Sequence, residues 1–304
     1  MVDQFINSWQ SFALLGLKKK FKFPNTSLIL VKIWINVLKE MSGSSVQSKI
    51  IELCKSFLAK FIQKTLKHCS NTKSADNEFY EGVEDEQKDI FDEFERFPNY
   101  CNDDILFPLI YTNTKTALEE YSTHLADKAK LEHKLGWLIN LLSSFIDIKN
   151  FSMKGSWSDP KVVDICALVF KLISSLLHSQ QTLGEYLELA FIKFCASFRR
   201  EALAKFEEKL EDYFSEEVEE ANPYNALEAV LRLADIGPMA ELIFKKLIND
   251  LAQYFDNRRI CEQALSKLKY LVSEPSISRN FLTLPVIQTL LQRHFVCTCN
   301  KYRK

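Results

Sequence analysis

The chain has 304 residues, of which 47% are hydrophobic, 12% are aromatic and only 7 are glycine. So few residues that accept a positive φ at low cost argue against glycine-rich phosphate loops, tight hairpin turns and β-barrels. The formal net charge of −1 creates no global field that would draw the chain to nucleic acid or to a membrane, so we expect neither as a partner.

Apolar residues recur at spacings of three and four along almost the whole chain, and the strict alternation of a strand is missing. This pattern predicts an all-α fold of about 12–14 helices, whose breaks are marked by Pro, Gly, Asn and Ser. In chain order, we expect helices at about 28–38, 50–66, 103–123, 130–149, 160–178, 183–199, 202–214, 224–235, 238–256, 259–273 and 284–296.

The expected helices form pairs that recur at about 40 residues, which is the period of HEAT-type repeats. We therefore predict a HEAT/armadillo-type helical-repeat solenoid, an α–α superhelix, extending as one array over residues 1–304. Each antiparallel pair should bury one face against its partner and another against the next pair. Because no crisp repeat consensus is present, the periodicity also allows a globular bundle.

The helix faces predict which side chains form the core. We expect it to contain Leu30, Ile33, Trp34, Leu53, Phe57, Phe61, Leu138, Leu141, Phe145, Ile165, Val169, Leu172, Leu189, Phe194, Leu231, Phe244, Leu247, Leu268, Leu271 and Leu290. The eight cysteines are scattered, mostly within apolar helical stretches, so we expect free thiols in a reducing compartment. Of these thiols, we expect four to be mostly buried and unpaired: Cys54, Cys166, Cys195 and Cys261.

No residue pattern points to catalysis, a cofactor or a metal. The chain has no Gly-x-Ser-x-Gly, no phosphate-binding loop and no dinucleotide fingerprint. Its five histidines do not form a metal site, and Cys297-x-Cys299 near His294 offers at most half of one. We therefore predict a protein that is not an enzyme.

The acidic residues are concentrated in two segments, an irregular insertion at 71–102 and an acidic helix with its following loop at 201–222. The second segment is the best candidate for a partner surface, although such acids can equally form a solvated face. Its candidate binding residues are Glu207, Glu208, Glu211, Asp212, Glu216, Glu217, Glu219 and Glu220.

Several stretches, in collinear order, resemble the exportin-7 family of nuclear transport receptors, the Ran-binding protein 16/17 type. One comprises Leu187-Glu188-Leu189-Ala190 with Phe194, Phe198, Arg199 and Arg200, and a later one comprises Ser276, Arg279, Leu284, Gln288, Leu291 and His294. Between and before them, further matches fall at Arg259-Cys261-Glu262, Trp137-Leu138-Ile139, Gly82-Val83-Glu84-Asp85 and Trp9-Gln10. The similarity is best from about residue 131 to residue 294.

This resemblance implies an importin-β superfamily exportin, a superhelix of HEAT repeats that is loaded with Ran-GTP and carries protein cargo through nuclear pores. Ran-GTP, cargo and nucleoporins would be its partners, and it would shuttle between nucleus and cytoplasm. Full receptors of this type are much longer, and the matches correspond to the middle of one, without the N-terminal Ran-binding repeats or the C-terminal arch. The alternative is a HEAT-like structural scaffold for protein–protein interaction with no link to Ran.

Overall fold

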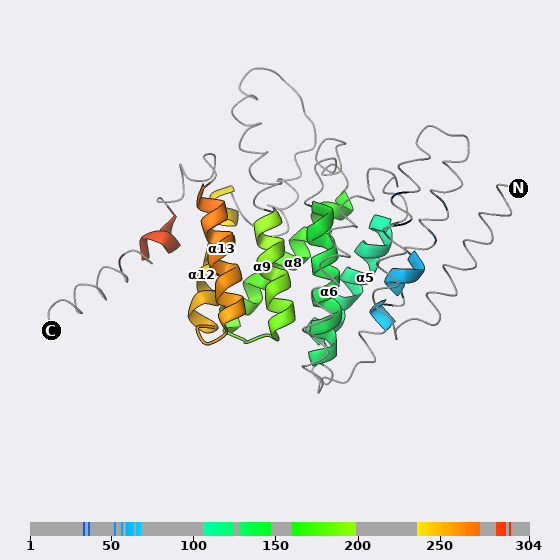
Figure 1. Cartoon of the computed structure of the whole chain (residues 1–304), viewed down its shortest axis with the longest axis horizontal. Helices are drawn as coiled ribbons and strands as arrows, with labels where there is room; N and C mark the ends of the chain where they lie inside the picture. The colour runs from blue at the N-terminus through cyan, green and yellow to red at the C-terminus, as the bar shows by residue number, and fades with distance from the viewer. Residues whose placement is uncertain are drawn as a thin grey trace, which may run out of the picture. The chain divides into compact units, whose positions relative to one another are not determined.

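The chain is described by a computed structural model that covers residues 106–123, 128–146, 160–198 and 236–273, with shorter stretches between 33 and 67 and between 284 and 292. Within this part, every regular element is an α-helix, which confirms the predicted all-α fold. The helices are α5 (Leu106–Thr123), α6 (Lys128–Ile146), α8 (Pro160–Ser179), α9 (Glu185–Phe198), α12 (Ile236–Gln253) and α13 (Arg258–Ser273) (Figure 1).

The chain divides into two compact units, and the first, Met1–Phe151, contains the helix pair α5–α6. Four residues separate the two helices, so they pack as antiparallel neighbours. Polar contacts join their ends across the connection: the Tyr121 hydroxyl donates to Glu132 Oε1 at 3.2 Å, and Lys134 Nζ lies 2.8 Å from Glu120 Oε2. From Leu135 to Ile146, α6 is buried around almost its whole circumference.

The second unit, Ser152–Lys304, contains the pairs α8–α9 and α12–α13. Helix α8 begins at Pro160, where a missing N–H removes no helical hydrogen bond. It ends at Ser179, and Gln180 then takes a left-handed conformation with φ of 51°. Helix α13 is capped by Asn257, whose Oδ1 accepts the Ile260 N–H at 3.1 Å.

The two pairs of the second unit stack directly on each other. Helix α9 packs against α13 and α12, and α8 also packs against α12. The helices predicted at 202–214 and 224–235 lie outside the described residues, so their place in the order of helix pairs stays a prediction.

Burial tests the predicted core. Ten of its members are buried: Phe61, Leu138, Leu141, Phe145, Ile165, Val169, Phe194, Phe244, Leu247 and Leu271. Four are only half-buried: Ile33, Leu172, Leu189 and Leu268. Leu189, for example, shares a face of α9 with the half-buried Glu185 and Lys193. The remaining six lie outside the described residues: Leu30, Trp34, Leu53, Phe57, Leu231 and Leu290.

The structure tests three of the four cysteines that were predicted to be buried. Cys166 and Cys195 are buried free thiols, as expected, and Cys54 lies outside the described residues. Cys261 is free but only half-buried, since it lies beside the narrow buried stripe of Ile260, Ala264 and Leu271 on α13.

One helix in the described part of the chain, Lys161–Ser179, is long and apolar enough to cross a membrane by length and composition. Half of this stretch is buried inside the fold, where α8 packs against α12. The core helix of a globular unit has the same composition, and here the apolar side chains are used in packing.

Candidate functional site

The acidic surface predicted from sequence, Glu207 to Glu220, lies outside the described residues. Its role as a partner surface therefore stays a prediction. The acidic insertion at 71–102 and the half metal site of His294, Cys297 and Cys299 also lie outside them.

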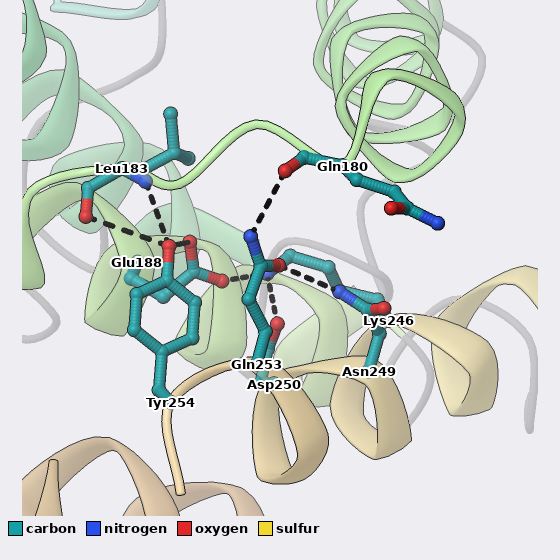
Figure 2. A network of polar contacts seen from close by, with 8 residues as sticks. All are labelled: Gln180, Leu183, Glu188, Lys246, Asn249, Asp250, Gln253 and Tyr254. Carbon is teal, nitrogen blue, oxygen red and sulfur yellow. Dashed lines mark hydrogen bonds and ion pairs between the residues drawn. The ribbon is translucent and has the colours of Figure 1, made fainter. Parts of the chain in front are cut away.

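The structure instead brings together a cluster of polar side chains where the α8–α9 pair meets the α12–α13 pair. We call Glu188, Lys246, Asp250 and Tyr254 the buried charge cluster. Their exposed fractions are 1%, 4%, 0% and 9%, so all four are removed from water. Figure 2 shows them converging from α9, from α12 and from Tyr254, the residue that follows α12.

Lys246 lies at the centre of the cluster. Its Nζ forms an ion pair with Glu188 Oε1 across the interface, and it donates to Asp250 Oδ1 at 2.6 Å one turn along α12. The ammonium also lies 5.9 Å from the centre of the Phe191 ring, within the range of a cation–π contact. One cation is therefore shared by two carboxylates and an aromatic face.

Tyr254 ties the cluster to the α8–α9 connection. Its hydroxyl donates to Glu188 Oε2 at 3.1 Å and accepts the Leu183 N–H at 2.7 Å (Figure 2). The N–H of Leu183 precedes α9 and has no helical partner to use, so the tyrosine satisfies a buried donor. The carbonyl of Tyr254 in turn accepts a weak hydrogen bond from Cys261 Sγ at 3.1 Å.

A more exposed ring of contacts surrounds the cluster. Gln253 Nε2 donates to the carbonyl of Gln180 at 3.2 Å. Gln180 is the residue in the left-handed conformation that follows α8. Asn257 Nδ2 donates to Glu185 Oε2 at 2.8 Å, and Arg259 lies 3.3 Å from Glu185 Oε1. The cap of α13 is thereby fixed to the first turn of α9.

Burial dominates the electrostatics of the cluster. It raises the pKa of Asp250 from 3.8 to about 6, although the neighbouring Lys246 ammonium opposes the shift. Burial also lowers the pKa of Lys246, with Asp250 opposing. The pKa of the Cys195 thiol is raised well above its usual value, first by burial and then by the negative charge of Asp250. A buried thiol of this kind stays protonated and is a poor nucleophile.

The groups of the cluster therefore serve to hold neighbouring helices together. Its carboxylates face an ammonium and a hydroxyl of the protein itself, and within the described residues no group of three or more His, Cys, Asp or Glu could hold a metal ion. Its members fix how α9 and α12 pack.

Sequence reasoning did not identify this cluster. Two signals were visible: Glu188 interrupts the apolar face of its helix, and Lys246 and Asp250 are spaced by four residues on one helix face. Neither signal indicated that Glu188 and Lys246 meet, because they are far apart in sequence.

The comparisons with known proteins agree with the helical architecture. The family model described as "Exportin-7-like, TPR domain" matches residues 70–297, which include the whole stretch from α5 to α13. Its description names TPR repeats, whereas the period of about 40 residues indicated repeats of the HEAT type. No curated protein and no solved structure matches the chain.

Proposed function

This chain belongs to the exportin-7-like family of nuclear transport receptors, and from that premise we propose that it binds Ran-GTP and protein cargo and takes part in nuclear export. The family is built from helical repeats and is in general not enzymatic. The match over residues 70–297 is the observation that carries the proposal.

The architecture of the described helices supports a binding function. Helix pairs that stack on one another present long surfaces made of many short elements, and such surfaces suit protein partners. In the second unit, the buried Lys246 and Tyr254 bond to Asp250 and Glu188 of the same unit, so these groups support the packing of the helices. The proposal accordingly includes no catalytic residue and no cofactor.

The proposed partners and location follow from the family. We expect Ran-GTP and a protein cargo to bind together, nucleoporins to be contacted during passage, and the protein to occur in both nucleus and cytoplasm. Nucleic acid and membrane have no place in this function.

The acidic residues between Glu207 and Glu220 are the proposed contact for a basic patch on Ran or on cargo. The segment that carries them connects the end of α9 at Phe198 to the start of α12 at Ile236. These helices pack against each other, so the segment leaves from and returns to one compact unit.

A second candidate is a helical scaffold that binds proteins without any link to Ran. The same stacked pairs would serve it, since stacking depends on apolar faces and not on the partner. The acidic residues would then form a solvated face.

A pull-down of the intact gene product with immobilised Ran separates the two candidates. Ran loaded with a non-hydrolysable GTP analogue should retain the protein, and Ran loaded with GDP should not. Retention by neither form, with the intact product folded, would overturn the proposal in favour of the scaffold.

A further inference from the structure

The buried charge cluster contains more negative than positive charge. Two carboxylates, Glu188 and Asp250, share the single ammonium of Lys246, and all three side chains are almost fully buried. A buried net charge is costly because water cannot solvate it. The cost falls if one carboxylate binds a proton.

The hydrogen bonds indicate which carboxylate it is. Glu188 faces Lys246 with one oxygen and receives the Tyr254 hydroxyl on the other, so its negative charge is stabilised at both atoms. Asp250 faces Lys246 through Oδ1 only, and its buried Oδ2 has no hydrogen-bond partner among the residues that the structure describes. A proton on Asp250 removes the uncompensated charge at Oδ2.

Among the described residues of the neighbouring helices, we find no positive charge paired with Asp250 apart from Lys246. From α9, Glu188 shares the Lys246 ammonium with Asp250, and the Cys195 thiol lies close enough for the charge of Asp250 to act on it; neither group carries a positive charge. On α8, the charged Lys161 and Lys171 are exposed, as is His178, and Asp164 is half-buried and acidic. On α13, Arg258 and Arg259 reach the carboxylates of Glu262 and Glu185 instead.

We propose that the buried charge cluster binds one extra proton, on Asp250, and that this proton strengthens the contact between the α8–α9 pair and the α12–α13 pair. The stability of the contact between the two helix pairs then depends on pH in the mildly acidic range. This inference depends on the geometry of the second unit and not on Ran binding.

The direction of the pH dependence follows from the pKa of Asp250 in the folded and unfolded states. Burial raises the pKa of Asp250 to about 6 in the folded protein, above the 3.8 of the free side chain. The folded state therefore binds the proton more tightly than the unfolded state. The contact between the two helix pairs accordingly becomes more stable as pH falls through 6. This stabilisation is lost as pH rises above 6.

Hydrogen exchange of the full chain, followed by mass spectrometry, tests the proposal. After correction for intrinsic exchange rates, peptides of α9 and α12 should be protected about tenfold more strongly at pH 5.0 than at pH 7.5, since Asp250 is then about nine-tenths protonated. The substitution Asp250→Asn mimics the protonated carboxyl, so it should make their protection high at both pH values. The matched control is Glu262→Gln, which removes an exposed carboxylate paired with Arg258 and should keep the wild-type response.

Three outcomes would overturn the proposal. The first is equal corrected protection of the wild-type peptides at both pH values. The second is a tenfold response that persists in Asp250→Asn. The third is loss of folding in Asp250→Asn, because a neutral amide should replace a protonated carboxyl without such damage.

Discussion

Lys246 is the positively charged member of the buried charge cluster. Its ammonium is paired with both Glu188 from α9 and Asp250 from its own helix, in a position that is 4% exposed. A buried ion pair of this kind contributes little net stability compared with apolar residues of similar size. Removing one partner is different, because it leaves the other charges buried without compensation.

We therefore expect Lys246→Met to lower the free energy of unfolding by about 3–5 kcal/mol. Denaturant unfolding at pH 7.5, followed by circular dichroism, measures this change. The control is Lys245→Met on the adjacent, exposed residue, which should change stability by no more than about 0.5 kcal/mol. Equal stabilities of the two variants would show that the cluster does not hold the helix pairs together.

At the scale of single residues, the sequence predicts burial better than it predicts polar contacts. Cys166, Cys195 and Phe194 were recognisable as core residues because their position on a helix face is set by local spacing. The contact between Glu188 and Lys246 depends instead on how two helices dock, which no local pattern specifies. A charged residue inside an apolar face says only that some partner is needed.

At the scale of helices, the predicted bounds of the six helices that the structure describes lie within three residues of the observed ones. Helix α8 was expected at 160–178 and extends over Pro160–Ser179, since Pro160 marks its start clearly. Helix α12 was expected at 238–256 and extends over Ile236–Gln253. It begins before Pro238 because proline is tolerated in a first helical turn. It ends at Gln253, although the Tyr254 N–H still donates to the carbonyl of Asp250 at 2.9 Å, and the Tyr254 hydroxyl bonds with the α8–α9 connection.

The start of α13 gives a prediction at this scale. Asn257 caps the helix through Oδ1 and reaches Glu185 on α9 through Nδ2. Asn257→Ala should therefore lower stability by about 1 kcal/mol or more, and Asn257→Ser, which retains a capping oxygen, should lower it less. Thermal unfolding of the three proteins measures the difference. If alanine and serine are equally tolerated, the cap is not what holds the start of α13.

The order in which helix pairs stack could not be predicted. Each pair is amphipathic in the same way, so the sequence pattern alone cannot choose between neighbours. The packing of α8–α9 against α12–α13 depends on contacts such as Tyr254 with Leu183 and Lys246 with Glu188. These contacts form only when the two pairs pack together.

At the scale of the whole molecule, electrostatic attraction should act mainly on the rate of association with a basic partner. Reversing Glu216, Glu217, Glu219 and Glu220 to Lys should leave helicity and melting nearly unchanged, because these residues are expected on a solvated face. It should slow association with Ran-GTP or cargo at low salt. The effect should fade as ionic strength increases and the Debye length falls to about 8 Å.

Stopped-flow association rates across a salt series measure this effect. The matched control is a reversal of the exposed Asp256 and Glu262, which lie on the α12–α13 turn and α13. Rates that do not change in the fourfold variant at any salt concentration would leave these acids as a solvated surface.

The central proposal is that the intact gene product binds the GTP-bound form of Ran, and family membership supports it. Isothermal titration of the intact product with Ran tests it most directly, once with a bound GTP analogue and once with bound GDP. We expect saturable binding of the GTP form and at least tenfold weaker binding of the GDP form, a difference of about 1.4 kcal/mol or more. Equal affinities for the two forms, or no heat of binding with either, would contradict it.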